Sequence, residues 1–372
     1  MKSSILSIGT ELTDGQITNR NAAWLSARVK PLGFRPCLHL SVPDDHAQIL
    51  EGLQWCADRS DLIFVTGGLG PTSDDFTRDM IATWAQSKMV FDPETWDYIS
   101  NRLRSRGLVV HEFQKQQCFF PEGSVLLKNA IGTAHGFRLT AKGKDLVILP
   151  GPPREIESIW IDHLHPWLLE KGSTLEAYET QAWQLLGIGE AIIPTLVEPL
   201  VQGQNLEVGY RVHLPYVEFK ITYRRSEASR IKDLIHRLNT ALAPWTVLRN
   251  EEDLAHRFSE KLHSFSQVVI SDQVTGNELT KRLAPHLMKP DGHQQITFQN
   301  HPTFLSGEAT LFLGMQPVDE NKINISLRGP AGSFEETLTS PYQGTTPTER
   351  RRLYFAEYAM IWWENKMTTK NI

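Results

Sequence analysis

The chain has 372 residues, of which 40% are hydrophobic and 22% are charged, as in an ordinary globular protein of two or three domains. The net charge of −5 gives no overall attraction to nucleic acid or to an anionic membrane, and no long apolar run predicts a membrane span. Three separated cysteines argue against a disulfide framework or a zinc knuckle, and the short apolar N-terminus is not typical of a signal peptide, so we expect a cytoplasmic protein.

The first segment is expected to form a strand, a polar loop and a helix. Apolar residues recur at helical spacing between residues 22 and 32, and Gly33 stands where a helix usually ends. Polar residues with ligand-binding potential lie between that strand and helix, where open α/β sheets bind ligands. They are Thr10, Glu11, Asn19 and Asn21. One of the two asparagines is also expected to cap the helix.

The next segment repeats this order, with a strand, the turn at residues 43–45, a helix and a second strand. Asp44 and Asp45 follow the strand directly. Either residue could cap the helix, and a role of Asp44 in ligand chemistry explains the pattern equally well. If the strands are adjacent and parallel, Asp44 lies close to the turn that follows the next strand.

That next turn lies in DLIFVTGGLGPTSDDFTRD, residues 61–79, around which the chain is organised. Four apolar residues predict a strand buried on both faces, and the glycines that follow let the backbone approach a ligand closely. Ser73, Asp74 or Asp75 could cap the helix that comes next. Backbone amides here could bind a phosphate, and paired carboxylates would then require a divalent cation. A plain capped βα turn explains the same residues equally well.

The rest of the N-terminal part predicts a polar helix at residues 92–107, which forms a lobe, and a strand-rich section after it. A further strand at residues 146–149 ends in Pro150-Gly151-Pro152-Pro153, a rigid turn, and Glu155 begins a helix. The prolines fix this loop before any ligand binds.

Five motifs occur in the order typical of the CinA family, which the chain therefore resembles. They are GTEL with Asn21, VPDD at 42–45, TGGLGPTSDD at 66–75, NAIGTAHGF at 129–137 and LPGPPRE at 149–155. The N-terminal domain of that family is similar to the molybdopterin-binding MogA and MoaB proteins. Small departures are Leu12-Thr13, where the family tends to have two leucines, and His135, where it usually has proline.

The resemblance implies an α/β protein of three domains. Residues 1–170 are expected to form a three-layer α/β/α domain of MogA/MoaB type. Residues 171–247 resemble a small α+β domain of KH type, and residues 248–372 resemble the α/β deamidase domain of CinA proteins.

The resemblance also implies an activity, the metal-dependent hydrolysis of ADP-ribose to AMP and ribose 5-phosphate. Functional aspartates of the wider superfamily match Asp44 and Asp75, which are the expected catalytic residues. Asp44, Asp74 and Asp75 are the expected ligands of a divalent cation, Mg, Mn or Co. The expected substrate-binding residues are Thr10, Glu11, Asn21, Thr66, Gly67, Gly68, Gly70, Thr72, Gly132, Thr133, Pro150, Gly151, Pro152 and Glu155.

In the middle section, the turn reads GIGE at residues 187–190, whereas KH domains that bind nucleic acid have a GXXG loop and positive charge. Basic and acidic residues balance between positions 171 and 245. We therefore expect a spacer or dimerisation module, and we expect no nucleic-acid partner.

The last section resembles a nicotinamide mononucleotide deamidase domain whose catalytic residue is lost. The family's nucleophile lies in a segment of the form ESCTGG, and the equivalent here is residues 272–277, with Gln273 in place of the serine. A carboxamide cannot form an acyl-enzyme, so we expect no deamidase activity. Residues 327–334 resemble a remnant of a later glycine-rich segment, and residues 348–366 predict an amphipathic helix with Leu353, Ala356, Met360 and Trp363 on one side. This domain is expected to be a scaffold for dimerisation or regulation.

Three functions remain open on the sequence. The first is the pyrophosphate hydrolase described above. The second is a pterin-handling protein that binds molybdopterin or transfers adenylate to it, because the same turn and aspartates would serve both reactions. The third is a non-catalytic nucleotide sensor. In each case we expect a homodimer that binds a small nucleotide-like molecule and no membrane.

Overall fold

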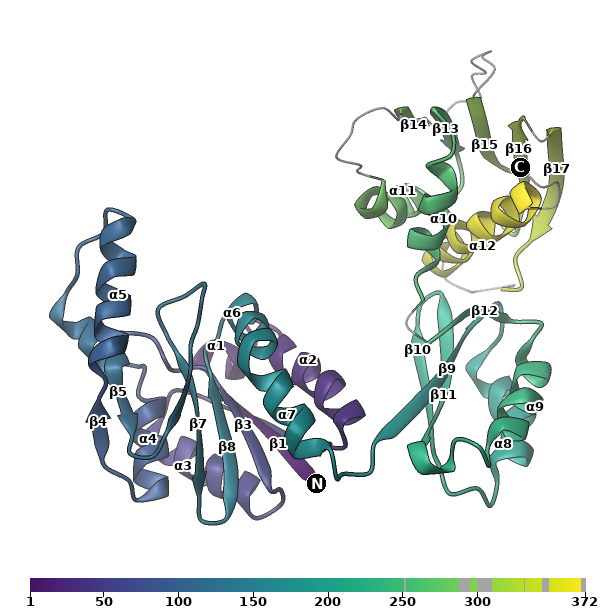
Figure 1. Ribbon diagram of the computed structural model, residues 1–372. Coiled ribbons are helices and arrows are strands. Elements are labelled where there is room, and N and C mark those ends of the chain that lie inside the picture. Colours follow the sequence, from purple (N-terminus) through teal and green to yellow (C-terminus); the bar gives the residue numbers. More distant parts are fainter. Residues whose placement is uncertain (251, 288–294, 300–309, 331, 343–347, 369–372) are drawn as a thin grey trace. The chain divides into compact units, whose positions relative to one another are not determined.

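The computed structural model describes residues 1–250, 252–287, 295–299, 310–330, 332–342 and 348–368. Contacts divide the chain into two compact units (Figure 1). The first unit contains residues 1–178 and 224–226, and the second contains residues 179–223 and 227–372. Of the helices in the described ranges, none is both long and apolar enough to cross a membrane.

The first unit is built on a six-stranded sheet with the order β2-β1-β3-β8-β7-β6. Its strands are β1 (Lys2–Ile8), β2 (Arg35–Val42), β3 (Leu62–Thr66), β6 (Val125–Leu127), β7 (Gly136–Ala141) and β8 (Lys144–Leu149). Its helices are α1 (Thr10–Thr13), α2 (Arg20–Val29), α3 (His46–Ala57), α4 (Thr77–Ala85), α5 (Pro93–Ser105), α6 (Pro153–Ile159) and α7 (His165–Gly172). A separate pair, β4 (Met89–Phe91) and β5 (Phe119–Pro121), accompanies α5.

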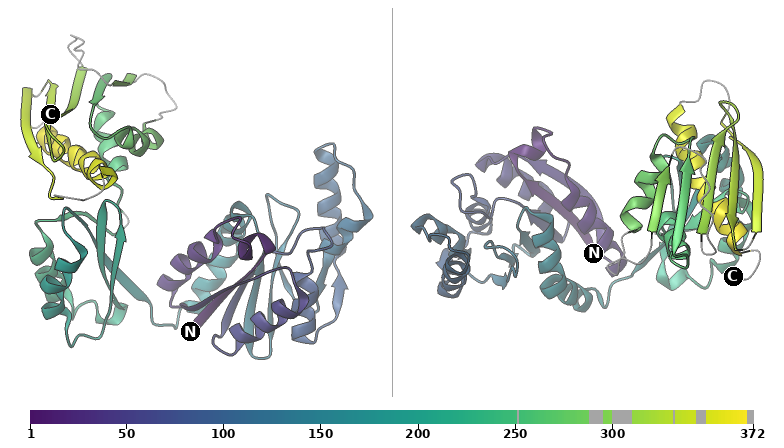
Figure 2. Two further views of the ribbon diagram at one scale, coloured as in Figure 1. Left: turned by 180° about the vertical axis from the view of Figure 1, so that it is seen from behind. Right: turned by 90° about the horizontal axis from the view of Figure 1, so that it is seen from above.

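Helices cover both faces of this sheet, so the first unit has the predicted three-layer α/β/α architecture (Figures 1 and 2). Every residue of β3 is buried, as the apolar run predicted, because its side chains alternate between the two helical layers. Ile63 and Val65 pack with α3 and α4, whereas Leu62 and Phe64 pack with α2 and α6. The central strand is therefore held from both sides.

The parallel strands bring the polar loops to one edge of the sheet. β1 pairs in parallel with both β2 and β3, and β3 pairs in parallel with β8. Because the carboxyl ends of all four strands point the same way, the loops after them meet at that edge. The chain passes from β1 to β2 on one side and returns to β3 on the other, which is the arrangement that opens a crevice between loops.

Helix starts and ends follow the predicted signals, with one exception. Asn19 caps α2 and Asp45 caps α3 by accepting hydrogen bonds from backbone amides, and Gly33, with φ of 88°, ends the turn that follows α2. The predicted cap of α4 is wrong: that helix begins at Thr77, and its N-cap residue Phe76 makes no side-chain cap. Ser73, Asp74 and Asp75 lie in a turn before the helix, too early to bond its amides.

The second unit contains two sheets, each with helices packed on it. The first sheet has the order β10-β11-β9-β12 and the second has the order β14-β13-β15-β16-β17. Elements of the first part are β9 (Tyr178–Leu186), α8 (Ile193–Val201), β10 (Glu207–His213), β11 (Tyr216–Arg224), α9 (Lys232–Leu242) and β12 (Thr246–Arg249). Those of the second are α10 (Leu254–Leu262), β13 (Gln267–Asp272), α11 (Glu278–Leu283), β14 (Gln295–Gln299), β15 (Thr310–Pro317), β16 (Lys322–Gly329), β17 (Gly332–Thr339) and α12 (Thr348–Thr368).

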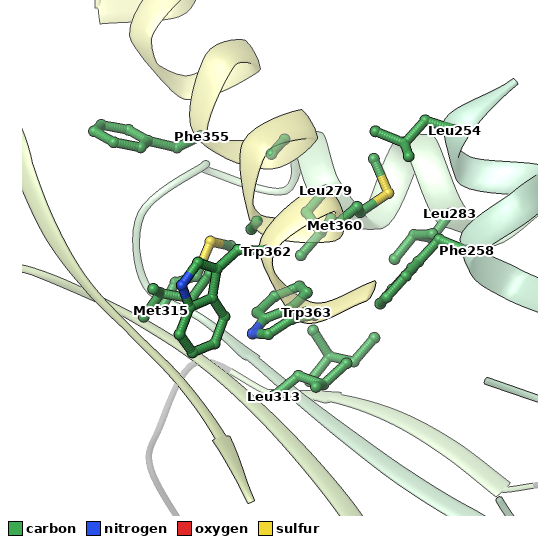
Figure 3. Close-up of a cluster of buried hydrophobic side chains, with 14 of the residues drawn as sticks. Leu254, Phe258, Leu279, Leu283, Leu313, Met315, Phe355, Met360, Trp362 and Trp363 are labelled. Atoms are coloured by element: carbon green, nitrogen blue, oxygen red, sulfur yellow. The ribbon is translucent and has the colours of Figure 1, made fainter. Parts of the chain in front are cut away.

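Helix α12 is the centre of the larger core in the second unit, and Figure 3 shows its side chains against α10, α11 and the sheet. Trp363 is fully buried, and its indole N–H donates to the Ser326 carbonyl at 3.0 Å. Ala356, Met360 and Trp363 of the predicted apolar side are buried and Leu353 is half-buried, while burial extends to Tyr354 and Trp362 on other sides of the helix. The helix is therefore more fully enclosed than a one-sided amphipathic pattern indicates.

The two parts of the second unit share a core. Leu186, Tyr216 and Leu248 of the smaller sheet pack into the cluster around α12. The expected domain boundary at residues 247 and 248 thus falls inside one compact unit. The glycine-rich segment 327–334 joins β16 to β17 as a hairpin, although residue 331 lies outside the described residues.

Candidate functional site

A cavity of about 530 Å³ opens where β1, β3 and β8 end. Most of the predicted site residues line it, although they come from loops far apart in the sequence. Those that do are Glu11, Asn21, Asp44, Thr66, Gly67, Gly68, Gly70, Asp74, Asp75, Thr133, Pro150, Gly151, Pro152 and Glu155. The structure therefore brings the first loop, the glycine turn (residues 67–72) and the proline turn (residues 150–153) to one place.

Three predicted residues, Thr10, Thr72 and Gly132, are not among the lining residues of this cavity. Thr10 holds Asp44 instead: its amide and hydroxyl donate to the Asp44 Oδ2 atom at 2.7 Å and 2.9 Å. The Gly132 amide donates to the Asn129 Oδ1 atom at 2.9 Å. These residues shape the cavity through their neighbours.

Thr72 organises the carboxylate pair beside the glycine turn. Its amide and hydroxyl donate to the Asp75 Oδ2 atom at 3.0 Å and 2.5 Å, and the hydroxyl also contacts the Asp74 Oδ1 atom. Hydrogen bonding from Thr72 lowers the pKa of the Asp74 carboxyl, so this group is ionised at neutral pH. Two carboxylates are thus held around one hydroxyl at the mouth of the cavity.

The glycine turn needs glycine at two positions for reasons that the geometry shows. Gly67 has φ of 101°, and a Cβ atom there would lie 2.1 Å from the Ile8 carbonyl oxygen of β1. A Cβ atom on Gly70 would lie 2.4 Å from the Asp75 Oδ2 atom. Side chains at these positions would separate the turn from β1 or displace the carboxylate.

The far side of the cavity is held by a buried asparagine that the sequence analysis did not single out. The Asn129 side-chain amide donates to the Glu155 Oε2 atom at 2.6 Å, and its Oδ1 atom accepts from the amides of Ile131 and Gly132. Burial raises the pKa of the Glu155 carboxyl. Asn129 begins the NAIGTAHGF motif, so the motif was the signal that could have identified it.

Other residues missed by the sequence analysis are Arg78, Gln116 and Gln117, which bond the carbonyls of the glycine turn. Gln117 also lines the cavity. No local pattern marks the two glutamines, because they reach the turn from a distant part of the chain. On the opposite side, the Asn21 side-chain amide donates to the Gly151 carbonyl at 2.8 Å, which ties α2 to the proline turn.

The charged side chains that line the cavity all have the same sign. Among the described residues that line it, five are acidic, namely Glu11, Asp44, Asp74, Asp75 and Glu155, and none is lysine, arginine or histidine. A phosphate ester entering this cavity would meet repulsion from the carboxylates unless a cation accompanied it. Backbone amides of the glycine turn are the attractive groups that the chain itself offers.

The predicted set of three metal ligands is not assembled as a closed site. Within the described ranges, no group of three or more His, Cys, Asp or Glu side chains is arranged to hold a metal ion. Asp74 and Asp75 nevertheless contact one hydroxyl, so one oxygen of each carboxylate is held beside the same atom of the turn. Such a pair fits a magnesium-like ion that takes its other ligands from water and from substrate phosphates.

Gln273, the residue expected in place of the family's nucleophile, also lies beside a cavity. Gln273 follows β13 and lines a smaller cavity of about 280 Å³ together with Val274, Arg351, Arg352 and Phe355. Asp272, just before it, accepts from the amides of Val274 and Thr275 at 3.0 Å and 2.8 Å. The loop that carries Gln273 is therefore fixed by its own hydrogen bonds.

Comparisons with known proteins show which family the chain resembles. Residues 4–170 match the family model described as "Probable molybdopterin binding domain". A relative from Caldanaerobacter subterraneus subsp. tengcongensis, described as "Putative competence-damage inducible protein", is 33% identical over 306 residues, which cover 81% of this chain and 74% of the relative. A similarly described protein of Thermoanaerobacter pseudethanolicus is 32% identical over 76% of this chain and 69% of its own length.

Among solved structures, CinA from Thermoplasma acidophilum is 25% identical and aligns with 45% of this chain and 99% of its own, with a TM-score of 0.42.

Proposed function

We propose a function from the premise that this chain belongs to the CinA family and carries a MogA/MoaB-like N-terminal domain. In this proposal the N-terminal domain hydrolyses the pyrophosphate bond of ADP-ribose or a related nucleotide to give AMP and ribose 5-phosphate. The observation that carries the proposal is the meeting of the glycine turn with the Asp74 and Asp75 carboxylates in one cavity. Amides suited to phosphate and oxygens suited to a divalent cation lie side by side there.

A divalent cation, Mg, Mn or Co, would neutralise the phosphate oxygens and lower the pKa of an attacking water. Asp74 and Asp75 would hold it, and Thr72 orients their oxygens. The amides of the glycine turn bind the phosphates. Asp44, which Thr10 fixes, faces the same cavity and can accept the proton of the attacking water.

The remaining walls suit the sugar parts of the substrate. Glu155 and Thr133 offer hydrogen-bonding groups to ribose hydroxyls, while the proline turn forms a rigid surface tied to Asn21. The cavity's volume, about 530 Å³, lies in the range of cavities that hold ligands of nucleotide size.

The test is product analysis with ADP-ribose and divalent cations, with and without a chelator. We expect AMP to form only with the cation, and to fall by about a hundredfold or more in Asp75→Asn, which keeps an acceptor for Thr72 but loses the charge. Asp79→Asn is the matched control, because Asp79 is exposed on α4 and is not among the cavity residues.

Normal turnover by Asp75→Asn would remove Asp75 from the mechanism. If AMP is absent but ADP-ribose raises the unfolding temperature, the protein is better described as a nucleotide sensor. The family description "Probable molybdopterin binding domain" favours a second candidate, a protein that binds molybdopterin or transfers adenylate to it. That candidate takes precedence if ADP-ribose produces neither AMP nor stabilisation.

We propose further that the last section has no nicotinamide mononucleotide deamidase activity, because Gln273 stands where the family's nucleophile is expected. Incubation of the intact protein with nicotinamide mononucleotide should release no ammonia. Ammonia release that persists in Gln273→Ala would contradict the assignment of residues 272–277 as the degenerate nucleophile segment.

The proposal also includes a cytoplasmic homodimer. The three cysteines are free thiols, which suits a reducing compartment. Light scattering on the purified protein would measure the oligomeric state directly.

A further inference from the structure

Arg78 is a buried cation placed directly behind the glycine turn. It is the second residue of α4 and only 2% exposed. Its Nη1 atom donates to the Leu69 carbonyl at 2.8 Å, and its Nη2 atom donates to the Gly70 carbonyl at 3.2 Å. In the part of the chain that the structure describes, no carboxylate forms an ion pair with it. Burial lowers its pKa to about 10, so the guanidinium stays charged at neutral pH.

The carbonyls of four consecutive residues, 67 to 70, are bound by the start of α4. The Thr77 hydroxyl donates to the Gly67 carbonyl at 3.0 Å, and the Thr77 amide donates to the Gly68 carbonyl at 3.2 Å. Arg78 donates to the carbonyls of Leu69 and Gly70. In a planar trans peptide, the carbonyl of one residue and the amide of the next point in opposite directions. The amides of residues 68, 69 and 70 must therefore point away from α4.

These three amides belong to residues that line the cavity, and they make no hydrogen bond to any other described residue. Three adjacent N–H groups of this kind form a concave site for an anion. Pro71 has no N–H, so the series ends at Gly70.

The orientation of these peptides matters because of the charges opposite them. The cavity already contains five carboxylates and no lining cation among the described residues. A peptide that flipped would replace an amide by a carbonyl oxygen and add to the repulsion of a phosphate. The charge of Arg78, just behind the turn, also attracts an anion bound in front of it.

We infer that Arg78 is a positioning residue. By binding the Leu69 carbonyl it directs the Gly70 amide toward the cavity, beside the Gly68 and Leu69 amides that Thr77 directs, and the three amides form a binding site for the pyrophosphate group. The inference rests on the proposed function for the identity of the anion. Arg78 touches no reacting atom in this scheme, because it acts through the peptides that it binds.

Removal of Arg78 should not unfold the turn. Each carbonyl has a second donor: Gln117 donates to the Leu69 carbonyl at 3.2 Å and Gln116 donates to the Gly70 carbonyl at 3.3 Å. The carbonyls would remain paired in Arg78→Met, but the two bonds that set their direction and the positive charge would be lost.

The experiment compares the binding of inorganic pyrophosphate and of ADP-ribose, each with Mg²⁺, by calorimetric titration in the full chain. We expect Arg78→Met to bind both about a hundredfold more weakly, with KM for ADP-ribose raised far more than kcat is lowered. Arg78→Lys keeps the charge but cannot bond both carbonyls in the same geometry, so we expect a loss of about tenfold.

Arg59→Met is the matched control. Arg59 also donates to a backbone carbonyl, that of Trp55 at 3.1 Å, but it lies beyond the far end of α3. It should leave binding and KM unchanged. Thermal unfolding checks that all variants are folded, and in Arg78→Ala added guanidinium should restore pyrophosphate binding where sodium chloride at the same concentration does not.

Unchanged pyrophosphate binding and KM in folded Arg78→Met would overturn the inference and leave the proposed hydrolysis intact. Wild-type binding of pyrophosphate without AMP formation would refute the hydrolysis, while the comparison of variants would still decide the role of Arg78. If the wild type bound neither pyrophosphate nor ADP-ribose with Mg²⁺, both would be wrong.

Discussion

Two neighbouring aspartates show how residues of one type acquire different roles. Asp45 accepts from the Gln48 amide at 2.9 Å and caps α3. Asp44 faces the cavity, and Thr10 donates to it twice. The local pattern left a capping role open for both residues, because each follows a strand and precedes a helix, and the family resemblance implied a catalytic role for Asp44. The structure separates the two residues, because Thr10 from another loop binds Asp44 while Asp45 binds the start of α3.

His135 provides a prediction at the residue scale. It is buried, and its Nδ1 atom accepts from the Asn129 amide at 3.0 Å. Burial, with a smaller contribution from Lys128, lowers the pKa of His135 from 6.5 to about 4. As pH falls through this range, the unfolded chain binds a proton that the folded protein does not, so stability decreases by on the order of 3 kcal/mol. Above pH 6.5 this contribution is fully present.

Thermal unfolding as a function of pH tests this. In His135→Asn an oxygen can replace the ring nitrogen as acceptor, so the unfolding temperature should fall less steeply between pH 6.5 and pH 4 than in the wild type. His39→Asn is the control for the loss of a histidine, because His39 is exposed on β2. Parallel profiles for the wild type and His135→Asn would refute the buried neutral histidine.

At the scale of elements, the glycine turn is defined by its neighbours as much as by its own residues. The Gly67 amide donates to the Leu149 carbonyl of β8 at 3.0 Å, and its Cα faces the end of β1. Thr77 and Arg78 bind the carbonyls from α4. A turn of glycines would be flexible alone, but here three elements determine its path.

Two glycine substitutions separate the causes of this rigidity. Gly143 has φ of 72° with no atom within 4 Å of an added Cβ, so Gly143→Ala should lower the free energy of unfolding by about 1 kcal/mol from backbone strain alone. Gly67→Ala adds a clash with the Ile8 carbonyl, so it should cost a further 1–3 kcal/mol or so. Denaturant unfolding measures both, and equal losses would show that the close approach to β1 contributes nothing.

At the scale of the whole molecule, the second unit is joined by a buried polar network. The Tyr216 hydroxyl of β11 donates to the Glu357 carboxylate of α12 at 2.5 Å, and Arg282 of α11 donates to the same carboxylate at 2.7 Å. Arg282 also forms two hydrogen bonds with Asp253, at 3.1 Å and 2.8 Å. Elements from both parts of the unit therefore share one set of charges.

Arg282→Met should destabilise this unit selectively. It would leave Glu357, only 3% exposed, without its cation, and we expect a loss of about 3–5 kcal/mol from breaking a buried pair. Lys281→Met on the same helix is the control, because its pair with Glu278 is largely exposed and should contribute less than about 1 kcal/mol.

Differential scanning calorimetry of the full chain would record the effect. The transition of the second unit should move to lower temperature in Arg282→Met, while the transition of the first unit stays in place. A shift of both transitions, or a separate early melting of residues 179–249 in the wild type, would contradict the single second unit.

The sequence by itself determined the α/β class, the strands and helices of the first unit, and most of the residues around its cavity. It could do so because apolar periodicity specifies the elements, and because parallel strands place the loops after them at one edge. It also placed Gly33 at the end of the turn that follows α2, and it narrowed the cap of α2 to Asn19 or Asn21, since capping depends on a few adjacent residues.

Only the tertiary structure decided which side chains support the walls of the cavity and which side chains face into it. Thr10 and Thr72 orient carboxylates, Asn129 supports Glu155, and Arg78 binds the carbonyls of the glycine turn. These roles depend on contacts between loops far apart along the chain, on which local propensity has no influence. The missing cap of α4 has the same origin, because Thr72 holds the carboxylates of Asp74 and Asp75, two of the three candidate caps, in the turn.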